Sequence, residues 1–193
     1  MMPIRTVPAR IPLVRSLASL CLCGLLFTAC SKTELPENAA DAARQAQVQA
    51  ATEAREQLAA QESSFTPVTA KWSLGDTTSE ITGFYQEDSL RMIREEMNMG
   101  DFGSTSARYF YSPDGKLTAY TESKQARSGA STGSATTEEI ELDLLFAESG
   151  SLLSGQRKAN GVAAPLVGIE EQGVRMHARE LESALADART HAK

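Results

Sequence analysis

The sequence predicts an α+β domain: an antiparallel β-meander sheet packed by a C-terminal helix and preceded by an alanine-rich helical stalk. Three stretches of sequence predict this fold. Residues 65–160 are rich in aromatic residues, threonine and turn signals; residues 173–190 repeat apolar side chains every three or four positions; residues 37–62 are almost wholly Ala, Gln, Glu and Arg. These patterns are typical of short strands, an amphipathic helix and a helix with little apolar surface, respectively.

Turn chemistry and alternation define the strands. Proline presets φ and glycine accepts positive φ, so Pro113-Asp114-Gly115 predicts a hairpin turn. From Ile140 onward, apolar and acidic residues alternate, which predicts a sheet with one face in water. Residues 126–137 and 160–168 are predicted to be loops. The predicted strands are Val68–Leu74, Ile81–Gln86, Leu90–Met97, Ala107–Ser112, Leu117–Ser123, Ile140–Ala147 and Leu152–Ala159.

The segment Leu90–Met97 also fits a helical stripe, so its own pattern leaves strand and helix open. Around it, the run from Gly83 to Leu117 combines Tyr109-Phe-Tyr with Asp114-Gly115-Lys-Leu. This run resembles a meander in uncharacterised bacterial envelope lipoproteins, in which tyrosine-rich strands alternate with Asp-Gly-Lys-Leu turns. The resemblance covers about forty residues. It implies a fold without an activity, and it favours a strand for Leu90–Met97.

Residues 37–64 are predicted to form the stalk. Val48 and Leu58 are the exceptions in a stretch that otherwise lacks large apolar residues, so the helix is expected to bury little surface. At 1.5 Å of rise per residue it would hold the domain about 40 Å away from its anchor. A self-associating helix that packs through alanines is the alternative, but no sustained heptad supports it.

The N-terminal segment has the layout of an export signal. Arg5, Arg10 and Arg15 precede an apolar stretch, Leu17–Ala29, that is short for a membrane span. The stretch ends in Leu26, Phe27, Thr28 and Ala29, directly before Cys30. This ending resembles a lipobox, the site read by lipoprotein signal peptidase, although Phe27 stands where leucine is usual.

The resemblance implies cleavage after Ala29 and attachment of acyl chains, as in palmitate-bearing lipoproteins, to Cys30. Residues 1–29 are therefore expected to be a signal peptide, 30–36 a lipidated tether and 65–193 the folded domain. Ser31 replaces the aspartate associated with inner-membrane retention, which favours the periplasmic face of the outer membrane over the inner membrane. A chance cysteine after an ordinary signal peptide, or an uncleaved helix, is the alternative.

Charge and cysteine content agree with this expectation. The chain has a formal net charge of −6, and removing a segment with three arginines and no acid makes it more acidic. An acidic protein is repelled by nucleic-acid phosphates and by anionic lipid surfaces, which argues against both as direct partners. Cys21 and Cys23 lie in the predicted signal, so Cys30 would be the single remaining thiol, and acylation would account for it.

Four motifs were weighed as sites of chemistry, and none predicts catalysis or a cofactor. The Gly-x-Ser-x-Gly pattern around Ser131 lies in a low-complexity loop and lacks the strand and helix that a nucleophile elbow requires. Asp101-Phe102-Gly103 is interpreted as a turn. His177 is interpreted as a helix-packing residue rather than a metal ligand. The row Glu138, Glu139, Glu141 and Asp143 is interpreted as the solvated side of a strand rather than a weak cation site.

Aromatic residues are the best candidates for a binding surface, because neighbours on a strand point to opposite faces of the sheet. The candidates are Phe84, Tyr85, Tyr109, Tyr111 and Tyr120. The sequence therefore predicts a membrane-anchored envelope lipoprotein with a non-catalytic binding or structural role. The alternative is an inhibitor or accessory subunit that docks on an envelope enzyme through an aromatic sheet face. A hydrolase would need a nucleophile–base pair that the sequence does not offer.

Overall fold

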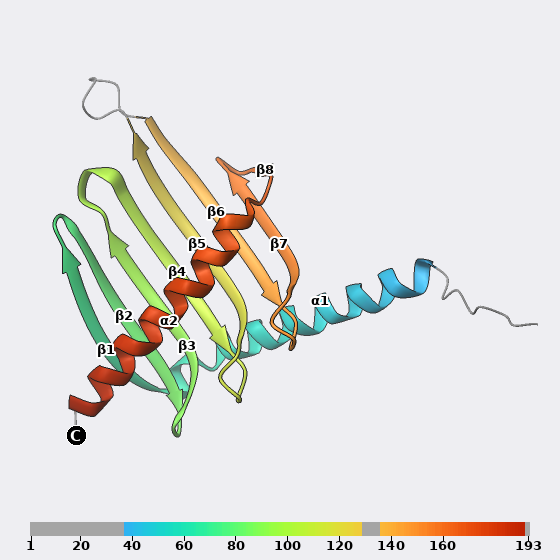
Figure 1. Ribbon diagram of the computed structural model, residues 1–193, viewed down its shortest axis with the longest axis horizontal. Helices are drawn as coiled ribbons and strands as arrows, with labels where there is room; N and C mark the ends of the chain where they lie inside the picture. Colours follow the sequence, from blue (N-terminus) through green and yellow to red (C-terminus); the bar gives the residue numbers. More distant parts are fainter. Residues whose placement is uncertain (1–36, 129–135, 192–193) are drawn as a thin grey trace, which may run out of the picture. The chain divides into compact units, whose positions relative to one another are not determined.

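The computed structural model describes residues 37–128 and 136–191, which form an antiparallel sheet and two long helices (Figure 1). The predicted signal and tether, and part of the predicted loop 126–137, lie outside the described residues. The helices are α1 (Glu37–Ala60) and α2 (Gly168–His191), and two 3-10 turns are η1 (Glu62–Ser64) and η2 (Gly100–Phe102). The strands are β1 (Thr66–Leu74), β2 (Thr77–Gln86), β3 (Ser89–Asn98), β4 (Gly103–Tyr111), β5 (Leu117–Ser128), β6 (Thr136–Phe146), β7 (Leu152–Ala159) and β8 (Val162–Ala164).

The strands lie in the sheet in the order of the sequence, so each pairs with its neighbours along the chain. The predicted antiparallel meander and α+β class are therefore confirmed. Each of the seven predicted segments coincides with a strand, including Leu90–Met97, which lies within β3; only Ser112 and Ala147 fall one residue beyond the strand ends. Register shifts between Phe84 and Tyr85 and between Phe110 and Tyr111 mark bulges where β2 and β4 approach their ends.

A short eighth strand lies within residues 160–168, which were predicted to be a loop. Asn160 and Gly161 have φ values of 51° and 75°, the left-handed conformation that a two-residue hairpin turn requires. The backbone N–H of Asn160 donates to the carbonyl of Glu139, and its side-chain oxygen accepts from the backbone N–H of Glu139. These two bonds hold the turn against β6, and β8 follows directly.

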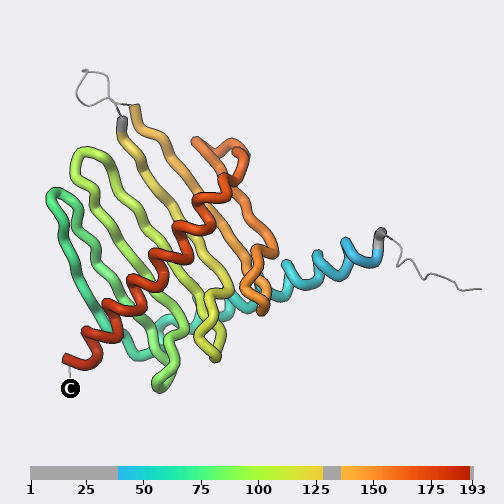
Figure 2. The backbone as a smooth tube through the Cα atoms, viewed as in Figure 1, coloured from blue at the N-terminus to red at the C-terminus, as the bar shows by residue number. Residues whose placement is uncertain are grey.

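Helix α2 crosses one face of the sheet diagonally, as the tube view shows (Figure 2). Its buried side chains recur every three or four residues and pack against the core of that face. The predicted C-terminal helix therefore covers the apolar face. The approach is close at β2, where a Cβ added to Gly83 would lie 2.7 Å from Leu185 Cδ1. The buried residues of the helix are Val174, Ala178, Leu181 and Leu185.

Helix α1 differs from the predicted spacer. Its second half contacts β5, β6 and β7, with Val48, Ala51 and Leu58 packing on the sheet face opposite α2. The Arg55 Nη1 atom lies 2.6 Å from Asp143 Oδ2 of β6, whereas residues 40–47 are exposed. The few apolar residues of α1 are enough to hold it against the sheet, because small alanines allow close approach and arginines bind the sheet.

The sheet face under α1 was expected to be wholly in water, but it carries a second apolar cluster. Strand alternation and the bulges, including a third between Leu145 and Phe146 of β6, direct large side chains of β2–β7 to this side, where the second half of α1 covers them. Only the remainder of this face is polar. The buried members of the cluster are Phe65, Phe84, Met92, Phe110, Ala119, Leu145 and Leu153.

Neither α1 nor α2 reaches the length and apolarity that a helix needs to cross a membrane, and this holds for every helix among residues 37–128 and 136–191.

Candidate functional site

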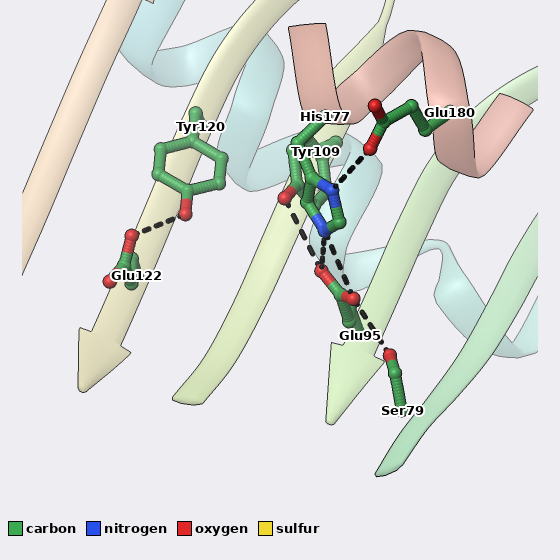
Figure 3. A network of polar contacts seen from close by, with 7 residues as sticks. All are labelled: Ser79, Glu95, Tyr109, Tyr120, Glu122, His177 and Glu180. Carbon is green, nitrogen blue, oxygen red and sulfur yellow. Dashed lines mark hydrogen bonds and ion pairs between the residues drawn. The ribbon is translucent and has the colours of Figure 1, made fainter. Parts of the chain in front are cut away.

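A buried carboxylate, Glu95 of β3, lies at the centre of a polar network between the sheet and α2 (Figure 3). Its side chain is only 2% exposed. The Ser79 hydroxyl of β2 donates to Glu95 Oε1 at 2.7 Å, and His177 Nε2 of α2 lies 2.9 Å from Oε2. The Tyr109 hydroxyl of β4 donates to Oε2 at 3.4 Å. These partners offset the cost of burying the carboxylate in an otherwise apolar layer.

His177 is held between two carboxylates. Its Nε2 faces Glu95, and its Nδ1 lies 3.3 Å from Oε2 of the exposed Glu180 on the next turn of α2. The hydrogen bond with Glu95 raises the pKa of His177 above its usual value, against the opposing effect of burial. The protonated ring can donate from both nitrogens, so the site favours a cationic His177. The structure thus gives this residue the helix-packing role that the sequence indicated.

Two tyrosines extend the network along the sheet. The rings of Tyr109 and Tyr120 are 4.8 Å apart, and the Tyr120 hydroxyl donates to Glu122 Oε2. Burial, together with neighbouring charged or polar groups, raises the pKa of both hydroxyls far above their usual value. Both hydroxyls are therefore neutral and able to donate at neutral pH.

The geometry of the network does not fit nucleophilic catalysis. A nucleophile must share its proton with a base, but Ser79 donates to Glu95 rather than to His177. The described residues also contain no group of three His, Cys, Asp or Glu side chains that could hold a metal ion. The network is therefore a polar clamp that fixes α2 against β2, β3 and β4, and we call Ser79, Glu95, Tyr109 and His177 the Glu95 clamp.

The aromatic residues proposed as a binding surface are buried, and this corrects the expectation of an exposed aromatic face. Phe84, at 6% exposed, lies under α1, whereas Tyr109 and Tyr120 lie under α2. The expectation failed because both faces are covered: α2 covers the tyrosines on one face, and α1 covers Phe84 on the other. Tyr85 and Tyr111 are also buried, but they line a cavity at the C-terminal end of α2.

Two of the four carboxylates in the acidic row on β6 are paired with cations. Asp143 pairs with Arg55 of α1, and Glu141 lies 2.8 Å from Nζ of Lys158 on β7. Glu138 and Glu139 are exposed. The row therefore serves as the polar side of the strand, in agreement with the sequence interpretation.

The remaining motifs fall at turns or outside the described residues. Asp101 and Phe102 form η2, and Gly103 begins β4, so this triplet is a turn as expected. Ser131 and the segment from Leu26 to Cys30 lie outside the described residues.

Sequence reasoning missed Glu95, the most deeply buried charged residue in the described chain. A signal was present: alternation along β3 places Ile93, Glu95 and Met97 on one face, where a charge between apolar neighbours indicates a buried partner. Its partner His177 could not be assigned, because the two residues are 82 positions apart and meet only through the crossing angle of α2.

Comparison of the chain with protein-family models, with curated proteins and with solved structures found no match, so the site is interpreted from its own geometry.

Proposed function

We propose that the protein is a lipid-anchored bacterial envelope protein, attached through Cys30, with a non-catalytic binding or structural role. The observation that carries the proposal is the order of the N-terminal residues: three arginines, an apolar stretch and then Ala29-Cys30. A cysteine with two acyl chains is stably attached to a bilayer, because each buried methylene contributes about 0.8 kcal/mol. No basic patch is then needed to hold an acidic protein at a membrane.

The Glu95 clamp supports a non-catalytic role. Its serine, histidine and carboxylate occur in a combination that many hydrolases use, but each group here binds a neighbour in the fold rather than an open cleft. Ser79 is also buried, with 3% of the residue exposed.

The docking alternative loses the surface on which it depended, since the aromatic side chains are packed beneath the helices. The second half of α1 is bound to the sheet rather than standing free of it. We place the anchored protein on the periplasmic face of a bacterial membrane, with the outer membrane favoured.

The test is membrane fractionation of the full chain and of its Cys30→Ser variant, expressed in a bacterium with an outer membrane. The unmodified chain should remain with membranes after a high-salt wash and be released by detergent, whereas Cys30→Ser should leave the membrane fraction. Cys23→Ser is the matched control, because it removes a thiol from the predicted signal and should not alter fractionation. Equal retention of Cys30→Ser and the unmodified chain would contradict the proposal. A density gradient then separates the two membranes.

A further inference from the structure

A cavity of about 430 Å³ lies where the C-terminal end of α2 meets the β2–β3 turn and the end of β4. Its volume is within the range of sites that take small ligands. Two aromatic rings and two aliphatic side chains give it an apolar wall, and these belong to Tyr85, Tyr111, Leu90 and Ala186. The polar lining residues include two carboxylates, Asp88 and Glu182, and the guanidinium of Arg189.

The Tyr111 hydroxyl, in the wall of this cavity, has no hydrogen-bond partner. The residue is 1% exposed, and among the buried side-chain nitrogen and oxygen atoms of the described residues its hydroxyl is the one without a partner. Burial of an unpaired hydroxyl is unfavourable, and native proteins rarely leave one. Tyr111 belongs to the packed core and also lines the cavity, so the cavity is a direction from which a partner can reach it.

The charges around the cavity leave one carboxylate uncompensated. Arg189 is already engaged: its Nη2 lies 2.8 Å from Asp88 Oδ1, and its guanidinium stacks 4.3 Å above the ring of Tyr85. Glu182, also in the lining, forms no ion pair with any cationic side chain in the described ranges 37–128 and 136–191. Burial raises the pKa of Tyr111 most strongly, and the charge of Glu182 and a polar contact with its carboxylate raise it further, although the two groups do not reach hydrogen-bond geometry.

We propose that this cavity binds a primary ammonium group carried on a short apolar chain. The ammonium N–H groups would donate to the Glu182 carboxylate and to the Tyr111 hydroxyl oxygen, which satisfies both unpartnered groups at once. Leu90 and Ala186 provide contact for the methylenes of the ligand. A ligand carboxylate would instead be repelled by Glu182.

This inference supplies a ligand chemistry for the binding role proposed above, and it does not depend on attachment through Cys30. An alkylammonium group has two natural sources, a free small amine and the lysine side chain of a partner protein. Fractionation of Cys30→Ser and ligand binding are separate measurements, so failure of either proposal leaves the other standing.

The test is a titration of the purified full chain, held in a neutral detergent, with n-butylammonium chloride, monitored by the amide NMR signals of Leu90 and Ala186. Saturable binding in the millimolar range is expected, with n-butanol, the uncharged analogue, binding at least tenfold more weakly. Glu182→Gln should weaken butylammonium binding at least tenfold, and Tyr111→Phe should weaken it severalfold. Glu180→Gln is the matched control, because it makes the same change on the same helix beside His177.

Two outcomes would overturn the inference. One is an absence of saturation up to about 50 mM butylammonium, which would mean that water alone fills the cavity. The other is equal binding by the Glu182→Gln and Glu180→Gln variants. A parallel titration with N-acetyl-lysine methylamide separates the two sources: binding tighter than that of butylammonium favours a lysine side chain, and weaker binding favours a free amine.

Discussion

His177 Nε2 lies 2.9 Å from Glu95 Oε2, and this contact joins residues 82 positions apart in the chain. It fixes α2 across the sheet, because Glu95 projects from β3 on the face that the helix covers. The carboxylate is nearly inaccessible to water, so the donors of the Glu95 clamp replace the hydrogen bonds that water would provide. Replacing any one of them should therefore lower the stability of the protein.

Replacing His177 by glutamine should destabilise the protein more in acid than in alkali. The pKa of His177 is raised above 6.5 in the folded chain, so the protonated ring contributes its full stabilisation below about pH 6.5. That contribution is lost as the pH rises through the folded-state pKa. The side chain is 29% exposed, so solvent screening limits the loss to about 1–2 kcal/mol.

Urea denaturation at about pH 5.5 and pH 9 measures this difference. His191→Gln is the control, because His191 contacts only the backbone carbonyl of Asp187 at the exposed end of α2. The prediction concerns the difference in free energy of unfolding between the unmodified chain and His177→Gln. If this difference grew as the pH rises, it would contradict a stabilising role for protonated His177.

Tyr109→Phe and Tyr111→Phe should change stability in different directions. The Tyr109 hydroxyl donates to Glu95, so its removal should cost about 1 kcal/mol. The hydroxyl of Tyr111 has no partner, so its removal should be neutral or stabilising by up to about 1 kcal/mol. Thermal or urea unfolding without added amine measures the stability change of each variant. Equal losses from the two substitutions would show that Tyr111 has a protein partner.

Gly103→Ala should be far more damaging than Gly115→Ala, although both glycines have positive φ. A Cβ on Gly103 would lie 1.7 Å from the backbone oxygen of Gln125, so β4 and β5 would have to separate. We expect a loss of at least about 2–3 kcal/mol, or failure to fold. At Gly115 no atom lies within 4 Å of the added Cβ, so only backbone strain of about 1 kcal/mol is expected. Similar midpoints of urea unfolding for the two variants would argue against this pairing of β4 with β5.

The contact of α1 with the sheet should appear as coupling between Arg55 and Asp143. Arg55 is 17% exposed and its Nη1 approaches both carboxylate oxygens, so a double-mutant cycle with Arg55→Met and Asp143→Asn should give about 0.5–1.5 kcal/mol. The exposed pair Lys158 and Glu141 provides the reference, with an expected coupling below about 0.5 kcal/mol. No coupling between Arg55 and Asp143 would favour a free-standing stalk.

The meander was predictable because its signals are local. Pro113, Asp114 and Gly115 specify one turn, and the alternation from Ile140 onward specifies both a strand and its inward face. The turn at Asn160 and Gly161 carries an equally local signal, the Asn-Gly pair, although residues 160–168 were predicted to be a loop. The position of α1 was not predictable in this way, because it depends on Arg55 meeting Asp143, 88 residues further along the chain.

The candidate site was harder to predict than the fold. Aromatic residues such as Phe84 and Tyr109 suit an interface or a core equally, and only the placement of both helices decides between them. Glu95 was obscured by the helix-like composition of its segment. The Tyr111 hydroxyl and Glu182 come together only where the end of α2 passes over β4, which no spacing in the sequence records.

Mass spectrometry of the N-terminal peptide of the protein purified from its own membranes tests the central claim most directly. The account predicts a peptide that begins at Cys30 and carries diacylglycerol on its thiol. A peptide with an unmodified Cys30, or a chain that retains Leu26–Ala29 upstream of it, would contradict the account.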